Sequence, residues 1–477
     1  YMKKYIVIIW LSLTMGLMSC DDYLDLVPRG EAVLNTTDDY LGLVESLTPS
    51  YPMTSFWYMA NEITYYKKAD LESYLYPLYS IGFFWDESAD RYNYTVDGDI
   101  ADLYSECYSR IASYNVVVEN MDDADGPESD KKLGIAQAKI MRAYNYFFLI
   151  NTFAKPYKKE TAATDMGIIV HKKFDLEAES KQYTVQEVYD FIEQDIKEAL
   201  ADLPDQALNS YRPTKSFGYA LKAKVHLYKG EIDLALEAAL NALKTNYHKL
   251  WNMNKMYEEA IANNPNLPSM PTLWGTTASF EDSDPEHLLY QFANTSTDPY
   301  PQYVRKEVID LYDKNNDLRY ITCWAYYMPA RPTAETGCVM FGSTKVKWNP
   351  GGMRLSEVYL MIAECYARKG DKDNAMKYLN DLYRNRVKTG TPELIASDAD
   401  EAFKLIREER KRELVLTYNG FFDMRRFCTE FNETLTKTYV NEAGETKVYT
   451  LKPDSPLLVW PFPAKAMETS DLVQNTK

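Results

Sequence analysis

The sequence lacks the short motifs that mark common catalytic sites. It has no G-x-S-x-G, P-loop, G-x-G-x-x-G or H-E-x-x-H pattern. Its four histidines lie far apart without metal-ligand spacing: His171, His226, His248 and His287. No C-x-x-C pair occurs, and five cysteines remain beside Cys20, which excludes a disulfide scaffold or a zinc site. The 70 acidic residues make close carboxylate pairs inevitable, so composition neither supports nor opposes acid–base catalysis.

Complete calcium-binding loops are also missing. Residues 122–126 have part of the pattern, but Met121 stands at the first ligand position. Residues 313–317 have similar spacing, but Trp324 stands where the final glutamate belongs. We expect both stretches to be helix-cap turns, and we predict no metal and no cofactor, since a structural calcium ion has no complete motif here.

Long apolar runs are absent after the first twenty residues, so we expect no membrane-spanning helix in the body of the chain. The start differs, because Lys3 and Lys4 precede an apolar run over residues 5–17 that leads to Cys20. As a helix this run would span only about 20 Å, less than the ~30 Å bilayer core. The pattern predicts an export signal over residues 1–19.

Positive charge is scarce, with 53 basic against 70 acidic residues and a net charge of −17. Removing residues 1–19 deletes two lysines and leaves 51 basic against 70 acidic residues, or −19. So acidic a chain does not attract nucleic acid or an anionic bilayer through its overall field. We therefore predict no nucleic-acid partner, and ligands that are neutral or captured by a local patch.

Apolar residues recur every three or four positions through most of the chain, which predicts an all-α fold. Such a stripe over residues 103–121 predicts one long helix, and residues 135–153 predict another. Thr184, with Glu187 three positions later, predicts a capping box at the start of a third helix, which Pro204 ends.

Two segments repeat one pattern with a shift of 140 positions, residues 219–240 and residues 359–380. Each has a small residue twelve positions before an alanine, which lets two antiparallel helices approach closely, and a Lys-Gly pair between them. The glycines, Gly230 and Gly370, suit the tight turn of a helix hairpin. The spacing is similar to that of tetratricopeptide hairpins.

Irregular, aromatic-rich segments separate the helical ones, chiefly residues 54–99, 263–301 and 346–352. Loops of this length in a compact domain are usually functional or disordered, and their tryptophans argue against disorder. We expect a scaffold of tetratricopeptide-type helix hairpins that carries long irregular loops.

The charged run over residues 406–414 (IREERKREL) predicts a salt-bridged structural helix rather than an anion site. On a helix, Glu408 would pair with Arg412, and Arg410 with Glu413.

Several segments together resemble the SusD/RagB family of outer-membrane lipoproteins. They occur in the family's order and cover nearly the whole mature chain: SCDDYLDLVP, LYSECYSRIASYNVVVENM, QAKIMRAYNYFFLINTF, RPTKSFGYALKAKVHLYKGEIDLALEAA, RLSEVYLMIAECYARKGDKDNAM, ERKRELVLTYNGFFDMRRF and LLVWPFPAKAMETSDLVQN. The chain departs from the family at residues 417–419, which replace a Phe/Glu pair, and at Phe427, which replaces a tryptophan. Both departures lie in packing motifs.

The resemblance implies a surface lipoprotein. Residues 17–20 are similar to a lipobox, which would place a diacylglycerol on the Cys20 sulfur, with fatty acyl chains such as palmitate. The acidic pair after Cys20 resembles the signal that sends such proteins to the outer face of the outer membrane. The expected organisation is a removed signal over residues 1–19, a lipidated tether over 20–35, and N- and C-terminal parts over 36–230 and 231–477 that form one unit.

The resemblance also implies the function. Family members bind oligosaccharides or polysaccharides, do not hydrolyse them, and deliver them to a SusC-like TonB-dependent transporter. Sugars present flat C–H faces and hydroxyl edges, so a binder needs exposed aromatic rings with polar groups beside them. The candidate residues lie off the periodic helices: Trp57, Trp85, Tyr92, Asn93, Tyr94, Trp274, Tyr300 and Trp324. The cluster over residues 85–94 ranks first, because it directly precedes the first long helix.

Three other interpretations remain open at this point. The same complex could take peptides, as RagB-like members do. The chain could be a surface glycoside hydrolase on an all-helical toroid. The unequal loops, and the fact that only two hairpin repeats are clear, count against this interpretation. It could also be a pure scaffold whose helix pairs bind another protein.

Overall fold

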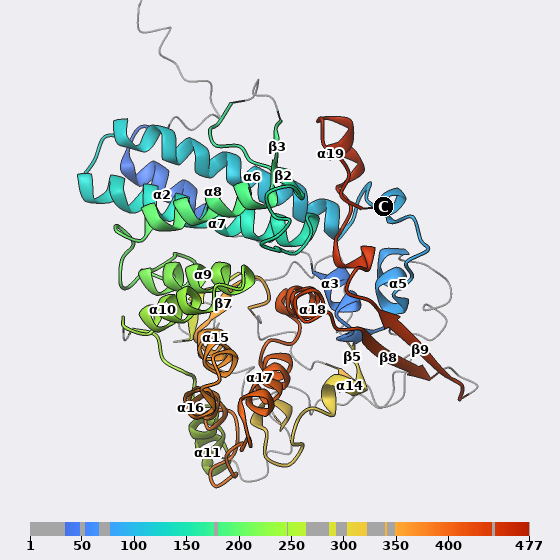
Figure 1. The fold of residues 1–477 in the computed structure, drawn as a ribbon. Coiled ribbons are helices and arrows are strands. Elements are labelled where there is room, and N and C mark those ends of the chain that lie inside the picture. Colours follow the sequence, from blue (N-terminus) through green and yellow to red (C-terminus); the bar gives the residue numbers. More distant parts are fainter. Residues whose placement is uncertain are drawn as a thin grey trace, which may run out of the picture.

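Helices form most of the structure, a computed structural model that describes residues 34–47, 53–65, 77–175, 180–245, 247–263, 286–291, 303–321, 339–340, 349–440 and 444–476 (Figure 1). The α-helices are α2 (Thr37–Ser46), α3 (Thr54–Met59), α5 (Pro77–Phe84), α6 (Asp99–Asn120), α7 (Glu128–Phe153), α8 (Val185–Ala199), α9 (Lys215–Tyr228), α10 (Ile232–Ala242), α11 (Met253–Asn263), α14 (Lys306–Ile309), α15 (Leu355–Arg368), α16 (Lys372–Tyr383), α17 (Ala399–Glu413), α18 (Asn419–Glu430) and α19 (Ala464–Glu468). The predicted all-α class is confirmed. Among the described helices, none is both long and apolar enough to cross a membrane.

The long helices stack as a ladder of neighbours. Helices α6, α7 and α8 lie side by side at the top of Figure 1, and α9, α10, α15 and α16 follow below them. Contacts run from α6 to α7, α7 to α8, α8 to α9, α9 to α10 and α10 to α15. The two hairpins that the sequence separates by more than a hundred residues are therefore neighbours in space.

Both predicted hairpins are confirmed, α9 with α10 and α15 with α16. Gly230 has φ +75° and Gly370 has φ +80°, the left-handed region that a tight turn between antiparallel helices requires. The paired small residues are all buried: Ala223, Ala235, Ala363 and Ala375. Small side chains thus allow close helix approach, as the spacing predicts.

The capping box at the start of α8 is also confirmed. The Thr184 side chain accepts from the Glu187 backbone N–H, and the Glu187 carboxylate accepts from the Thr184 backbone N–H. On α6, the predicted stripe faces the core, since Leu103, Cys107 and Ile111 are buried.

Helix α17 is a salt-bridged structural helix, but its partners differ from the predicted ones. Arg410 pairs with Asp423 of α18 and Arg412 with Glu409, rather than with Glu413 and Glu408. Glu413 instead accepts from three arginines that lie elsewhere in the chain: Arg319, Arg354 and Arg386. Because this face of α17 is buried, its charged residues can pair with residues of other elements. Helical spacing alone cannot predict such partners.

Strands are short and link segments that are distant in sequence. They are β1 (Ile63–Thr64), β2 (Met166–Ile169), β3 (Gln182–Thr184), β4 (His287–Leu289), β5 (Tyr303–Val304), β6 (Val339–Met340), β7 (Met353–Arg354), β8 (Leu435–Val440) and β9 (Thr446–Leu451). Strands β1, β5 and β6 form one antiparallel sheet, and the pairs β2–β3, β4–β7 and β8–β9 are two-stranded. The β8–β9 hairpin projects at one edge of the molecule in Figure 1.

The largest of the core clusters in the described residues joins the first and last parts of the described chain, from Tyr40 to Leu472. At its centre, Phe56 of α3 stacks on Phe421 of α18 with ring centroids 4.9 Å apart, and Trp460 packs against both rings. The predicted division at residue 230 falls in the turn between α9 and α10, and it stays a prediction.

Candidate functional site

A short 3₁₀ helix, η2 (Arg91–Tyr94), carries three of the candidate binding residues. Asp90 caps it: one carboxylate oxygen accepts from the Tyr92 N–H at 3.2 Å, and the other accepts from the Asn93 side chain at 3.0 Å. The Thr95 hydroxyl donates to the Tyr92 carbonyl at 2.7 Å and closes the turn. Local hydrogen bonds thus hold this turn at both of its ends.

Arg91 anchors η2 to the C-terminal segment. Its guanidinium is 1% exposed and donates to the carbonyls of Val459 at 2.8 Å and Pro456 at 2.7 Å, and to the Thr476 hydroxyl at 3.0 Å. It also lies over the Trp460 ring, 5.7 Å from the centroid. A buried, multiply bonded arginine fixes the position of the turn that it belongs to.

The outward side of η2 presents aromatic and amide groups. Tyr94 is 44% exposed, Asn93 is exposed and Tyr92 is half-buried. Each side chain matches what a sugar offers, since a ring face contacts C–H groups and an amide or phenol bonds hydroxyls. Of the predicted residues, these three form the part that the structure shows to be accessible.

Two predicted platform residues are core residues instead. Trp57 is 4% exposed and Trp85 is 7% exposed. The Trp85 indole donates to the Met59 carbonyl at 2.9 Å, and the Lys437 ammonium lies 4.2 Å from its ring centroid. The prediction that they are exposed binding platforms is wrong, because the loop-rich segment folds its large rings into the interior.

The remaining predicted residues lie outside the described ranges. These are Cys20, Trp274, Tyr300 and Trp324. Their roles stay predictions.

A cavity of ≈ 210 Å³ lies beside the start of α18, lined by residues that include Glu62, Trp85, Lys411 and Asp423. One Glu62 carboxyl oxygen accepts from the Leu416 N–H at 3.0 Å. Burial raises the pKa of Glu62 to about 8, and the nearby Asp423 acts in the same direction. The group is therefore protonated at neutral pH, and can donate as well as accept a hydrogen bond.

Sequence reasoning missed Glu62, because a single glutamate in a loop-rich segment carries no periodic or motif signal. Its carboxyl also meets the backbone of α18 directly. A Cβ atom at Gly420 would clash with the Glu62 Oε1 atom, so a larger residue there would force the Glu62 side chain to move.

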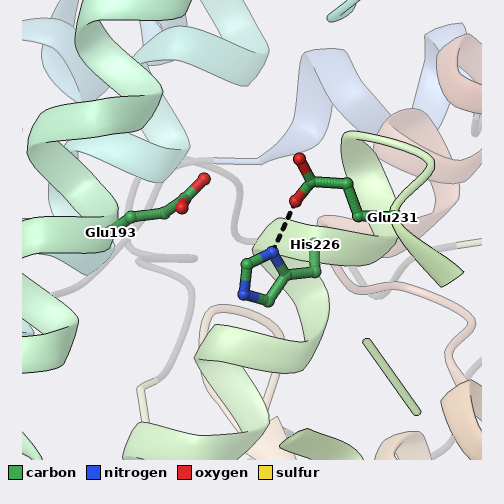
Figure 2. Close-up of side chains that lie close together, drawn as sticks. All are labelled: Glu193, His226 and Glu231. Atoms are coloured by element: carbon green, nitrogen blue, oxygen red, sulfur yellow. Dashed lines mark hydrogen bonds and ion pairs between the residues drawn. The ribbon is translucent and has the colours of Figure 1, made fainter. Parts of the chain in front are cut away.

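Glu193, His226 and Glu231 bring three possible metal ligands together (Figure 2). His226 Nδ1 lies 2.6 Å from a Glu231 carboxylate oxygen, and Glu193 projects from α8 toward the pair. Lys229 pairs with both glutamates. Since an ammonium group already neutralises these carboxylates, the cluster is an ion-pair network that ties α8 to the α9–α10 turn.

The calcium-like stretch at residues 313–317 is a turn that closes on itself. The Asp313 carboxylate accepts from the backbone N–H groups of Asn315 at 3.0 Å and Asn316 at 3.2 Å.

Comparison with known families identifies the fold. Residues 22–227 match a family model described as starch-binding and associating with the outer membrane, and residues 341–476 match the SusD family model. The chain belongs to the SusD/RagB family. Its departures from the family pattern are packing positions, as expected, since Tyr418, Asn419 and Phe427 are all buried.

Individual SusD relatives are distant in sequence and close in fold. A SusD-like protein P2 from Formosa agariphila is 26% identical over 250 residues, which cover 50% of this chain and 46% of that protein. The match thus spans about half the length of that curated relative. A SusD superfamily structure from Bacteroides thetaiotaomicron has a TM-score of 0.69 at 18% identity and covers 93% of this chain and 100% of its own. A laminarin-binding SusD-like protein has a TM-score of 0.61 at 19% identity, covering 93% and 99%.

Proposed function

We propose that this SusD/RagB protein is a lipid-anchored glycan receptor on the outer face of the outer membrane. It binds oligosaccharides or polysaccharides without cleaving them and passes them to a SusC-like TonB-dependent transporter. Family membership supports the class of ligand, and the laminarin-binding relative shows that the same fold serves a glycan.

The glycan proposal rests on the accessible aromatic and amide side chains of η2. Two tyrosines and an asparagine lie on a turn that the buried Arg91 anchors to the C-terminal segment. A rigid turn lowers the ordering cost of binding. Two ring faces contribute only modest apolar burial at ~25 cal/mol per Å², which suits a receptor that must release its ligand.

The direct test is a binding screen with the purified chain against glycans, laminarin among them, and with peptides as the alternative ligand class. The double variant Tyr92→Ala/Tyr94→Ala should weaken the best glycan about tenfold or more, since it removes two ring faces. Tyr247→Ala is the matched control, because Tyr247 is 46% exposed and follows α10. If the double variant bound the glycan as tightly as the wild type, η2 would not be part of the glycan site.

The non-catalytic part of the proposal has its own readout. Incubation with the bound polymer should release no new reducing ends, and released sugar would instead favour the glycoside hydrolase interpretation. The anchor is tested by Cys20→Ala, which should free the mature chain from membranes and remove its fatty acid. The transporter is tested by asking whether the adjacent reading frame encodes a large TonB-dependent barrel and whether such a barrel co-purifies with this chain.

A further inference from the structure

A second cavity, of ≈ 260 Å³, lies between the segment after α7, the α9–α10 turn and α18. Five basic side chains line it, Lys158, Lys159, Lys229, Arg425 and Arg426, against two acidic ones, Glu160 and Glu430. Lys158 and Lys159 are exposed, so the cavity reaches the surface. This local excess of positive charge stands out on a chain of net charge −17.

Arg425 is the unusual member of the cavity. Its side chain is 1% exposed, and its Nη2 atom donates to the Ala154 carbonyl at 2.5 Å. Its Nε and Nη1 atoms are buried and have no hydrogen-bond partner, and no carboxylate among the described residues pairs with it. Burial lowers the pKa of Arg425 to about 10. A buried guanidinium without an anion is costly, because desolvation is not compensated.

The other arginine in the cavity is different. Arg426 forms ion pairs with Glu364 and Asp423, so its charge is neutralised within the protein, although its Nε atom is unpartnered. Lys229 is similarly paired with Glu193 and Glu231. Of the buried cations at the cavity, Arg425 is thus the one whose charge is uncompensated within the described part of the chain.

Two hydroxyl groups complete the set of available donors. The Tyr228 Oη and Thr429 Oγ1 atoms are both buried, and neither has a hydrogen-bond partner. Both residues line the cavity with Arg425. Buried polar groups in proteins are almost always hydrogen-bonded, so several unpartnered donor atoms around one cavity indicate an absent partner. All of these unpartnered N–H and O–H groups can donate a hydrogen bond to an oxygen atom.

We propose that this cavity binds a multi-oxygen anion, a sulfate, phosphate or carboxylate group, with Arg425 as its counter-ion and Tyr228 and Thr429 as hydroxyl donors. An oxyanion in the cavity would accept from unpartnered N–H and O–H groups that line it and would compensate the buried guanidinium. The proposed anion site is independent of the glycan site at η2, since no residue of η2 lines this cavity.

Titration calorimetry on the purified chain in chloride buffer of matched ionic strength tests the site with four probes: sulfate, phosphate, glucuronate and glucose. We expect the anions to bind and glucose not to bind. Tighter binding of glucuronate would identify a sugar acid as the source of the anionic group, and tighter binding of sulfate or phosphate would identify a free ion. Absence of anion binding, or equal binding of glucose, overturns the proposal.

Tyr228→Phe and Thr429→Val localise the site without a folding penalty. Neither hydroxyl has a bond to lose, so the unliganded thermal midpoint should stay equal or rise, while anion affinity falls about tenfold for each variant. Arg425→Gln should abolish binding.

Tyr146→Phe is the matched control for the hydroxyl variants. It removes a buried hydroxyl that bonds the His171 backbone, so it should lower the thermal midpoint and leave anion binding unchanged. Anion binding that is unaffected by both Tyr228→Phe and Thr429→Val would place the ion elsewhere and overturn the assignment.

Discussion

Lys224 of α9 and Glu357 of α15 form an ion pair in which each side chain is 1% exposed, although 133 positions separate them in the chain. The same ammonium donates to the Tyr418 hydroxyl at 2.7 Å and to the Asn419 side chain at 2.6 Å. One buried cation thus joins the first hairpin, the second hairpin and the start of α18.

Removing that cation should be strongly destabilising. Lys224→Met leaves the buried Glu357 carboxylate with only a longer ion pair to Arg410, at 3.9 Å, and we expect a loss of about 3–5 kcal/mol in the free energy of unfolding. The double variant Lys224→Met/Glu357→Leu should recover much of this loss, because it removes both charges. Urea denaturation of the single and double variants measures the coupling.

The control for this pair lies between the same two hairpins. Lys369 pairs with Asp233 at the surface, where both side chains are exposed. Lys369→Met should leave the urea midpoint unchanged, since exposed ion pairs are screened by solvent. A comparable loss from both lysine variants would show that burial does not decide the effect.

Local sequence patterns predict the hairpins but not their neighbours. The Ala and Gly spacing of α9–α10 and α15–α16 is a local signal, because the first hairpin spans only residues 215–242 and the second only residues 355–383. The Lys224–Glu357 contact has no such signal. The same limit applies to Arg410, because helical spacing pairs it with Glu413, whereas burial pairs it with Asp423 of α18.

The aromatic candidates show the corresponding limit for the site. Position off the periodic helices identifies Tyr92 and Tyr94, which are accessible, but also Trp57 and Trp85, which are buried. Residue type cannot separate these cases, since a ring suits a core as well as a sugar face. The Arg425 cavity cannot be predicted from the sequence for a related reason, because its proposed donors come from α9 and α18, which lie far apart in the chain.

The hairpin turns make a second prediction. Gly370 has φ +80°, and no atom lies within 4 Å of the position that an added Cβ would take, so Gly370→Ala meets only backbone strain and should cost about 1 kcal/mol. Gly42 has equally open space but lies within helix α2, where alanine is preferred by about 1 kcal/mol. Gly42→Ala should therefore stabilise the protein. Thermal denaturation of both variants checks the opposite signs, and a shared sign would contradict the backbone argument.

Arg91 should act as a positioning residue for η2. Arg91→Leu leaves the Val459 carbonyl without its donor and removes one of the hydrogen bonds that the Pro456 carbonyl accepts, and we expect a loss of about 2–4 kcal/mol in the free energy of unfolding. Amide exchange should also accelerate in residues 90–95. Glycan affinity should fall although both tyrosines remain. Unchanged exchange in this turn would show that Asp90 and Thr95 hold it without the arginine.

Glu62 predicts how stability depends on pH. Its pKa in the folded protein is about 8, against an ordinary value of 4.5 in the unfolded chain. Between these values the folded state holds a proton that the unfolded state has released, so stability falls as pH rises from about 4.5 to 8. The stabilisation that comes from holding this proton is fully present below pH 4.5 and is lost above pH 8.

Glu62→Gln should flatten this slope, because the amide stays neutral and can still accept from the Leu416 N–H. The variant should match the wild type near pH 5 and exceed it near pH 8, as measured by urea midpoints across that range. Glu433→Gln is the control: hydrogen bonds from Arg407 lower the pKa of Glu433, so its contribution is constant above about pH 5 and the variant should shift the whole curve without changing its slope. Parallel curves for Glu62→Gln and the wild type would mean that Glu62 is ionised in the folded protein, with water reaching the carboxylate through the cavity beside α18.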